Sequence, residues 1–426
     1  MIGKIKNIYK YNENAKVLVN NFVFLILLKA ASFIFPLITL PYLSKVIGVE
    51  KFGAIAFAAA VMTFVETITD WGFNYTATRD VAKCRDDLQQ VSRIFSEVMW
   101  CKIILTTICF FVLYLLCNCI PYLGTYKNLL FFTFAYIPGH IFFPEWLFQA
   151  FERMKYITIL SLLSKLVFTI LIFVCIRKDV DYIYQPLLNA AGFGVSAFFA
   201  FYIILNKLKV HFLIPSLNSI YMRLKSSVDM FISLIFPNLY TSMSTVILQT
   251  YCGNTATGIY SGGQKMQSII DEFTKVLSRT FFPFLARRKE KHYIYVWISA
   301  IISVLSCVLM FLGADLFVEY LLTPEFHNAA VVIRIFSISP FFLFLMNTYG
   351  TNYLVIVGKE NILRNIIVGC SALGFVLTCF FTIQFSYIGA SITVVSVWGI
   401  RGMLTYYYAI KCKKNGYFID SRRFLS

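Results

Sequence analysis

The chain has 426 residues, of which 59% are apolar and only 14% charged, and its formal net charge is +17. A soluble domain carries about 25% charged residues, so this composition excludes a soluble globular enzyme and predicts an all-α integral membrane protein in a lipid bilayer. The positive charge does not indicate a nucleic-acid partner, because Lys and Arg are enriched in the cytoplasmic loops of membrane proteins.

Apolar runs long enough to cross a bilayer follow one another along the whole chain. Residues 1–16 are polar and basic, and no small-residue cleavage site follows them, which predicts a retained first span. Because a span needs roughly 20 apolar residues, the sequence predicts twelve transmembrane helices. The first six lie at about 19–42, 53–74, 98–120, 127–150, 157–176 and 184–205. The second six lie at about 227–250, 258–285, 293–313, 329–357, 363–384 and 387–410, the tenth being long enough to tilt or break.

The basic residues predict the topology of these spans. If the N-terminus is inside, 25 of the 38 Lys and Arg residues fall in cytoplasmic segments and five fall in outside loops. This asymmetry alternates from loop to loop. It predicts cytoplasmic N- and C-termini in a multi-pass protein of the bacterial inner membrane.

The two halves of the sequence show signs of an internal repeat. Gly48 and Gly53 stand between the first two spans, and Gly253 and Gly258 stand 205 residues later, between the seventh and eighth. Parallel repeats of this kind place a substrate path between the halves. We therefore predict an N-terminal lobe, a cytoplasmic linker and a C-terminal lobe with a cytoplasmic tail, at residues 1–206, 207–226 and 227–426.

Eight basic residues lie at the predicted depth of the membrane. A charge at the bilayer centre costs roughly 2.5 to 3.5 kcal/mol, so each such side chain is expected to face the bundle interior or a hydrated cavity. Two of them, Lys102 and Arg279, lie near span ends and are expected to snorkel to the interface. The others are Lys29, Lys165, Lys265, Lys275, Arg334 and Arg401.

The basic side chains nearest the middle of their spans predict a cationic cavity. Lys29 lies near the midplane, where it either serves function or forms a structural pair with Glu66 or Asp70. Together with Lys265, Arg334 and Arg401, it would suit a phosphate or pyrophosphate group, which Arg binds through its bidentate fork and Lys binds as a point charge.

Acidic residues are the candidates for ion coupling. Glu66 and Asp70 are four residues apart on one helix face, where two desolvated carboxylates tend to share a proton or a cation. A salt bridge to Lys29 is the alternative. Asp271 and Glu272 lie in the eighth span, and Asp271 is expected to pair with Lys275 at i, i+4. The polar stripe of this span predicts a helix that lines a hydrated cavity, or alternatively one that lies flat at the interface.

Motifs for catalysis or cofactor binding are missing from the sequence. It contains no GxxxxGK[ST] phosphate loop, no GxSxG and no CxxC pair. The four histidines are scattered and predict no metal-ligand cluster. We therefore expect no catalytic residue, no metal and no cofactor.

Four stretches resemble the O-antigen flippases (Wzx type) of the polysaccharide transporter family, within the multidrug/oligosaccharidyl-lipid/polysaccharide exporter superfamily. The stretches are PLITLPYLSKVIGVEKFG at 36–53, DWGFNYTATRD at 70–80, PEWLFQAFERMK at 144–155 and GIYSGGQK at 258–265. Arg79 and Lys265 match the family's pattern by position and join the candidate cargo-binding residues.

The resemblance implies both a fold and a function. The fold would be two six-helix lobes in a MATE-like V shape around a central cationic cavity. The cargo would be an undecaprenyl-pyrophosphate-linked oligosaccharide, the O-antigen repeat unit, moved from the inner to the outer leaflet by alternating access. An ion gradient of protons or sodium would drive it, and an O-antigen polymerase and a chain-length regulator would be partners.

Two other functions remain open on the sequence. The first is a drug/cation antiporter of the same fold, which a cavity rich in Lys and Arg disfavours. The second is a membrane glycosyltransferase or polymerase, which needs a long outside loop with catalytic residues. The longest predicted outside loop, about 314–328, is short, and we expect it to be a solvated connector.

Overall fold

The computed structural model describes the backbone of residues 2–287 and 292–414, and the side chains of residues 34–275, 277, 278, 281, 285 and 292–414. All regular structure in these residues is helical. The first half contains α1 (Ile2–Asp70), α2 (Phe73–Lys83), α3 (Leu88–Cys119), α4 (Pro121–Thr125), α5 (Lys127–Phe134), α6 (Tyr136–Ile141), α7 (Glu145–Ala150), α8 (Met154–Cys175), η1 (Asp179–Tyr184) and α9 (Gln185–Asn206). The second half contains α10 (Leu217–Asn238), α11 (Ser242–Arg287), α12 (His292–Leu312), α13 (Ala314–Leu321), η3 (Pro324–Phe326), α14 (Ala329–Phe336), α15 (Ser339–Leu345), η4 (Met346–Val355) and α16 (Glu360–Cys412).

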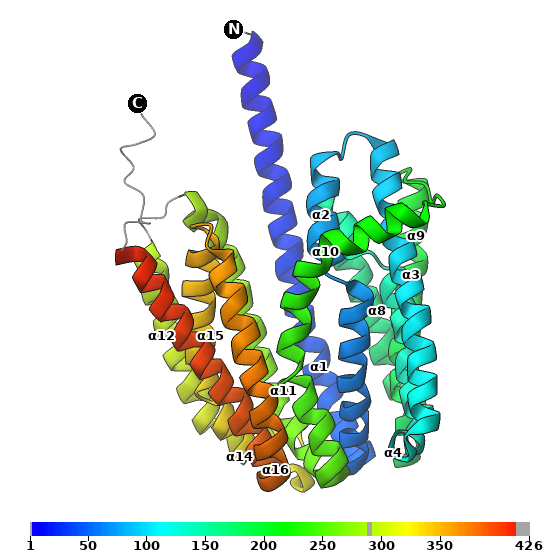
Figure 1. Cartoon of the computed structure of the whole chain (residues 1–426), viewed down its shortest axis with the longest axis vertical. Coiled ribbons are helices and arrows are strands. Elements are labelled where there is room, and N and C mark those ends of the chain that lie inside the picture. The colour runs from blue at the N-terminus through cyan, green and yellow to red at the C-terminus, as the bar shows by residue number, and fades with distance from the viewer. Residues whose placement is uncertain (1, 288–291, 415–426) are drawn as a thin grey trace. The chain divides into compact units, whose positions relative to one another are not determined.

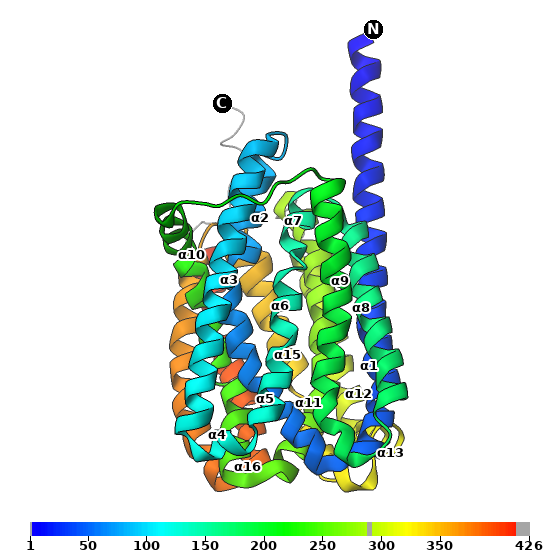
Figure 2. The same cartoon turned by 90° about the vertical axis from the view of Figure 1, so that its right-hand side faces the viewer.

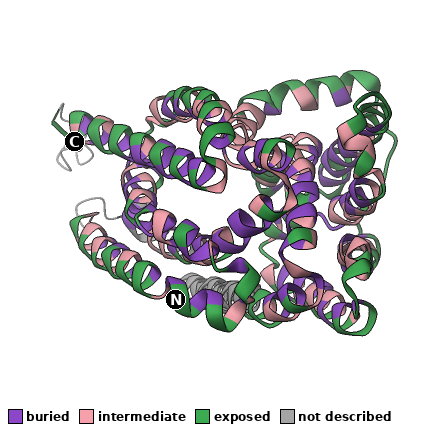
Figure 3. Ribbon diagram, turned by 90° about the horizontal axis from the view of Figure 1, so that it is seen from below, coloured by how far each residue is buried: buried purple, intermediate pink, exposed green. Residues whose placement is uncertain are grey.

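The surfaces of the helices are apolar, as a lipid environment requires. Eight segments of the described chain are long and apolar enough to cross a membrane. Large apolar side chains are exposed on them, among them Phe198 on α9 (70%) and Trp297 on α12 (69%), whereas soluble proteins rarely expose wide apolar patches. Figure 3 shows exposed and buried residues on opposite faces of individual helices. The predicted all-α membrane class is confirmed, and the count of twelve spans stays a prediction.

The chain divides into two compact units. Unit 1 contains Met1–Tyr42 and Met62–Leu234, and unit 2 contains Leu43–Val61 and Ile235–Ser426. Within unit 1, α8 and α9 pack side by side (Figure 2). Residues 43–61 group with unit 2, although they lie inside the predicted N-terminal lobe. The predicted boundaries of the lobes and linker remain a prediction.

Three long helices contain a break in their backbone. Gly48 in α1 (φ 69°, ψ 175°) and Gly253 in α11 (φ 83°, ψ −178°) adopt nearly the same conformation, which is open to glycine and strained for other residues. Ser386 breaks α16, whose orange and red arms meet at the bottom of Figure 1. The two glycines that echo each other in the sequence therefore have the same local geometry.

The second pair of repeated glycines forms a close backbone contact within unit 2. A Cβ atom on Gly53 would lie 1.9 Å from the carbonyl oxygen of Asn254, and one on Gly258 would lie 2.1 Å from that of Val49. The Val49 amide also donates to Glu325 Oε2 at 3.0 Å. The segment after Gly48 and the segment after Gly253 thus touch through positions that admit no side chain.

Two predicted spans are interrupted, and one predicted loop is partly helical. The span predicted at 127–150 is not one continuous helix: the chain there forms α5, α6 and α7, with Pro144 preceding α7. The tenth predicted span, described as long enough to tilt or break, consists of α14, α15 and the π-helical turns of η4 in succession. The region expected to be a solvated connector contains α13 and η3, and its Phe326 is fully buried.

The predicted cytoplasmic linker is held against α2 and α3 of unit 1. Arg223 on α10 donates from Nη1 to Asp80 Oδ2 and from Nη2 to Glu97 Oε2, each at 2.8 Å. Trp71 stacks on Phe231 with ring centroids 4.0 Å apart. These two charge-assisted contacts of Arg223, one to each carboxylate, fix the first part of α10 on unit 1.

The glycine contact in unit 2 gives a stability prediction. Gly258→Ala should force the two backbones apart and lower the free energy of unfolding by about 1 to 3 kcal/mol, as overpacking does. Gly369→Ala is the matched control, because Gly369 is also helical and in unit 2, but a Cβ atom added there would meet no other atom within 4 Å. We expect a lower melting temperature in detergent for Gly258→Ala only. Equal melting temperatures would contradict the close contact.

Candidate functional site

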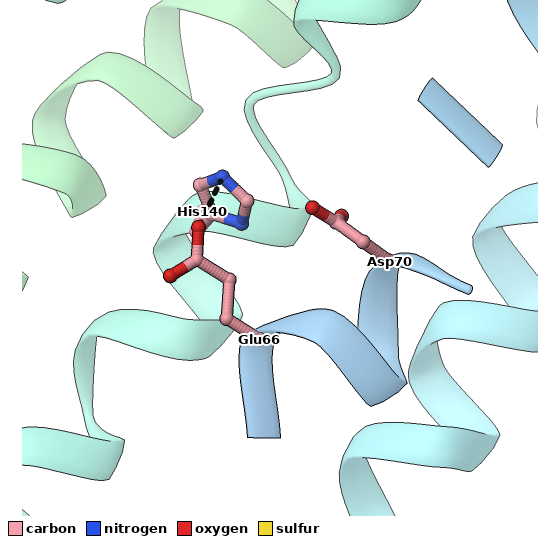
Figure 4. Close-up of side chains that lie close together, drawn as sticks. All are labelled: Glu66, Asp70 and His140. Atoms are coloured by element: carbon pink, nitrogen blue, oxygen red, sulfur yellow. Dashed lines mark ion pairs between the residues drawn. The ribbon is translucent and has the colours of Figure 1, made fainter. Parts of the chain in front are cut away.

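Three ionisable side chains meet inside unit 1. Glu66 and Asp70 lie at the end of α1, and His140 lies on α6. One ligand atom from each residue lies within 4.8 Å of the others, and Figure 4 shows the three side chains gathered together. His140 Nε2 is 3.6 Å from Glu66 Oε1.

Local structure explains how these side chains are presented. Glu66 and Asp70 are one helical turn apart and therefore share a face of α1. The helix stops directly after them, because Trp71 (φ 45°) and Gly72 (φ 78°) both have positive φ values. On the short helix α6, Tyr136 and His140 are also four residues apart, and the Tyr136 hydroxyl donates to Glu66 Oε2 at 3.0 Å.

Asp70 is neutralised by a buried lysine. Lys102 Nζ on α3 lies 2.6 Å from Asp70 Oδ1, and the side chain of Lys102 is only 3% exposed. Asn74 donates to the other carboxylate oxygen at 3.0 Å. The expectation that Lys102 snorkels to the interface is therefore wrong, because its ammonium group is turned inward to a carboxylate. The side chain of Lys29 lies outside the described residues, so its predicted role stays a prediction.

A third carboxylate extends the cluster to α7 and α8. Glu145 accepts a hydrogen bond from Ser161 Oγ at 3.3 Å. It also interacts electrostatically with His140, Lys165 and Asp70. We call the set Glu66, Asp70, Lys102, Tyr136, His140, Glu145 and Lys165 the unit 1 polar network.

Sequence reasoning found part of this network and missed the rest. It identified the Glu66–Asp70 pair from its i, i+4 spacing. It expected His140 to stand apart from other candidate ligands, which is wrong, since the fold brings His140 beside both carboxylates. No spacing pattern could have found it, because Tyr136 and Glu66 are 70 residues apart in sequence.

The predicted cationic residues of unit 2 differ in their surroundings. Lys265 on α11 is exposed, and no acidic group among the described side chains forms an ion pair with it. Arg401 on α16 is half-buried, and its Nε atom is buried without a hydrogen-bond partner in the described part of the chain. Arg334 instead forms an ion pair with Asp315. Lys265 and Arg401 therefore suit an anionic ligand. Arg334 is already paired with Asp315, which favours a structural role for Arg334.

The remaining predicted residues are placed as follows. Arg79 on α2 is exposed and pairs with its neighbour Asp80 at 3.3 Å. Asp271 and Lys275 form the expected i, i+4 pair at 2.8 Å. Glu272 is half-buried beside them. Glu66, Asp70 and Arg79 thus belong to unit 1, and Lys265, Asp271, Glu272, Arg334 and Arg401 belong to unit 2.

Eight apolar segments together with a network of ionisable groups inside one helical unit are the features of a multi-pass membrane transporter. The model of the family described as "Polysaccharide biosynthesis protein" matches residues 18–289. This match covers more than half of the chain, and the chain belongs to that family.

Two relatives carry the same name in different bacteria. A "Putative O-antigen transporter" of Escherichia coli (strain K12) is 26% identical over 394 residues, which are 90% of this chain and 95% of that protein. A protein of the same name from Shigella dysenteriae is 26% identical over 354 residues, covering 81% of this chain and 88% of that protein. The resemblance to the polysaccharide transporter family is confirmed.

Solved structures show the same fold at low identity. The "Lipid II flippase MurJ, inward closed conformation" aligns with a TM-score of 0.71 and 12% identity, covering 91% of this chain and 87% of that one. An inward-facing multidrug resistance MATE family transporter of the MOP superfamily aligns with a TM-score of 0.66 and 11% identity, covering 91% and 96%. Together with the family match, these findings identify a non-enzymatic, multi-pass transporter of the bacterial inner membrane.

The buried Lys102–Asp70 pair yields a second stability prediction. Lys102→Met should leave a desolvated carboxylate without its counter-charge and lower the free energy of unfolding by about 3 to 5 kcal/mol. The double variant Lys102→Met/Asp70→Asn should recover most of that loss. Lys127→Met, which removes a lysine whose hydrogen bond to Asn118 is exposed to solvent, should cost about 1 kcal/mol or less. Thermal unfolding in detergent measures all three. A melting temperature of Lys102→Met equal to that of the wild type would refute the buried pair.

Proposed function

We propose that the protein is a flippase that moves an undecaprenyl-pyrophosphate-linked oligosaccharide, an O-antigen repeat unit, from the inner to the outer leaflet of the bacterial inner membrane. Transport occurs by alternating access and is coupled to an ion gradient. Both termini lie in the cytoplasm, and an O-antigen polymerase and a chain-length regulator act on the same pathway.

The observation that carries this proposal is the family match together with the relatives named as O-antigen transporters, one of which aligns with 90% of this chain. The likeness in fold to a lipid II flippase supports it, because the name of that protein also denotes a lipid-linked cargo. Such a cargo needs a path for a polar head group beside a path for its lipid tail, which a helical bundle open to the bilayer can supply.

The helix breaks support twelve spans in two six-helix lobes. Three of the eight apolar segments contain an internal break, at Gly48, Gly253 and Ser386. If each of these three segments crosses the membrane twice and each of the other five crosses once, the eight segments give eleven spans. The interrupted α5–α7 region, which is not one of the eight, would be the twelfth. The lobes would then form a V around a central cationic cavity.

The cargo's pyrophosphate is proposed to bind the cationic residues Lys29, Arg79, Lys265, Arg334 and Arg401. Lys265 and Arg401 have the strongest support. Lys265 has no acidic ion-pair partner among the described side chains, and Arg401 Nε is buried there without an acceptor. A cation at membrane depth without a counter-charge is costly, and a phosphorylated lipid head would supply the missing charge.

Ion coupling is assigned to Glu66 and Asp70, with Asp271 and Glu272 as further candidates. The unit 1 polar network supports the first pair, because it places both carboxylates beside other polar and charged side chains, His140, Tyr136 and Lys102. Asp70 is paired with Lys102 and Asp271 with Lys275, and each pair weakens the case for that carboxylate as the ion site. Binding or release of the coupling ion would alter the charge of unit 1 and so bias the rocking of the lobes.

The cargo site can be tested with two lysines on one helix. In liposomes that contain the purified protein and a fluorescent undecaprenyl-pyrophosphate-linked oligosaccharide, leaflet-specific quenching measures the flipping rate. Lys265→Ala should slow flipping about 10- to 100-fold, the value of a lost charged hydrogen bond of about 1.5 to 3 kcal/mol. Arg401→Ala should have a similar effect.

Lys275→Ala is the matched control, because Lys275 lies on α11 like Lys265 but is already paired with Asp271. It should flip cargo within about twofold of the wild-type rate. Equal rates for Lys265→Ala and Lys275→Ala would argue against a cargo site at Lys265. Efflux of a cationic drug with no flipping of the lipid would favour the antiporter function instead.

A further inference from the structure

We propose that the first turns of α10, with the linker before them, form a docking surface for anionic lipids of the membrane leaflet on that side, which is the inner leaflet in the proposed topology. We call this the α10 lipid surface, and its residues are Lys207, Lys209, Ile214, Leu217, Tyr221, Lys225 and Val228. A lipid contact here is independent of the cargo and of the coupling ion.

The first part of α10 lies across the upright helices of unit 1. Figure 1 shows it running obliquely at one end of the unit, whereas α3 and α8 stand upright both there and in Figure 2. Both of those helices are among the apolar segments long enough to cross a membrane, so the upright direction is that of the membrane normal. A helix that crosses this direction and has an apolar face has the geometry of a helix lying in the membrane interface.

The start of α10 is level with the start of the third predicted span. Trp100 Nε1 on α3 donates to the carbonyl oxygen of Leu213 at 3.1 Å, and Cys101 Sγ donates to that of Ile220 at 3.7 Å. The third span is predicted to begin at about residue 98, and tryptophan is enriched where a span meets the head groups. These two contacts therefore place the first turns of α10 at the depth of the lipid head groups.

One face of α10 is held against α2 and α3. Arg223 pairs with one carboxylate from each of these helices, and the hydroxyl oxygens of Ser227 and Thr76 are 2.8 Å apart. Ile220, one turn before Arg223, is buried. Because the helix is fixed through this face, its other faces keep a defined direction relative to unit 1.

A second face of α10 is apolar and exposed. Leu217 is 82% exposed and Tyr221 is 60% exposed, and their i, i+4 spacing places them on one stripe of the helix. Val228 continues this stripe, and Ile214, in the linker just before the helix, is 89% exposed. Apolar side chains so exposed at head-group depth are expected to insert into the acyl-chain boundary.

The charges around the apolar stripe select the kind of lipid. Residues 207–228 contain four basic residues and no acidic one. Arg223 is neutralised by its two carboxylates, whereas Lys207, Lys209 and Lys225 are exposed and form no ion pair with the described acidic side chains.

Lys225 lies one turn after Tyr221, at the edge of the stripe. A lysine there can lay its apolar stem along the membrane and extend its ammonium group to a phosphate. An apolar stripe bordered by exposed lysines is complementary to a bilayer that contains anionic head groups. A protein partner would have to reach a stripe that lies at head-group depth, so lipid is the occupant that the geometry favours.

Fluorescence quenching tests the depth of the stripe. In nanodiscs whose lipid carries bromine high on its acyl chains, the added indole of Leu217→Trp should lose its emission, because bromine quenches on contact. Ser226→Trp is the matched control: Ser226 is exposed on the same helix, two and a half turns after Leu217 and hence on the opposite side. Its added indole should keep its emission. Equal emission from the two added indoles would overturn the proposal.

A lipid titration tests the charge. In an uncharged detergent, phosphatidylglycerol should raise the melting temperature of the wild type more than phosphatidylcholine does. Lys209→Gln/Lys225→Gln should weaken the apparent affinity for phosphatidylglycerol about fivefold per lysine removed, the effect of one basic residue near an anionic surface. Lys45→Gln/Lys178→Gln removes two exposed lysines from the predicted outside loops and should bind phosphatidylglycerol as the wild type does.

Two results would refute an anionic-lipid surface on α10. The first is an equal affinity of the wild type and both double variants for phosphatidylglycerol. The second is a wild-type dimer in detergent that Leu217→Asp converts to a monomer, because a second copy of the chain would then cover the stripe.

Discussion

A charged side chain in the interior of a membrane protein must be neutralised, because lipid and packed helices provide no water to solvate it. Unit 1 meets this constraint by gathering acidic and basic groups from α1, α3, α6, α7 and α8. The ion pair between Lys102 and Asp70 anchors that network. With Asp70 paired to Lys102, Glu66 lies beside Tyr136 and His140.

In unit 2 some cations are paired with carboxylates and others are not. Arg334 is balanced by Asp315, and Lys275 by Asp271, but Lys265 and Arg401 lack such partners among the described side chains. We interpret this contrast as two roles: the carboxylates of unit 1, one of which is paired with Lys102, are proposed to respond to a small ion, and the unpaired cations of unit 2 are proposed to receive an anionic head group. Both interpretations follow from the cost of placing a charge at membrane depth.

Backbone breaks give the helices their arrangement. Glycine alone adopts the conformation of Gly48 and Gly253 without strain, and the absence of side chains at Gly53 and Gly258 permits a contact that a methyl group would block. The short helices α6 and α7, produced by the interruption of the fourth predicted span, present His140 and Glu145 to the network. A continuous helix across 127–150 would orient these side chains differently, so the irregular region creates the candidate site.

The sequence by itself determined the helical membrane class, the glycine positions, the Asp271–Lys275 pair and the shared helix face of Glu66 and Asp70. These features are local: they depend on apolar runs, on glycine's backbone freedom and on i, i+4 spacing. Only the tertiary structure decided that Lys102 neutralises Asp70, that Tyr136 and His140 face Glu66, and that Asp315 neutralises Arg334. The partners within unit 1 lie on different helices, 32 to 74 residues apart in sequence, and such contacts follow from helix packing, which leaves no periodic signal in the chain.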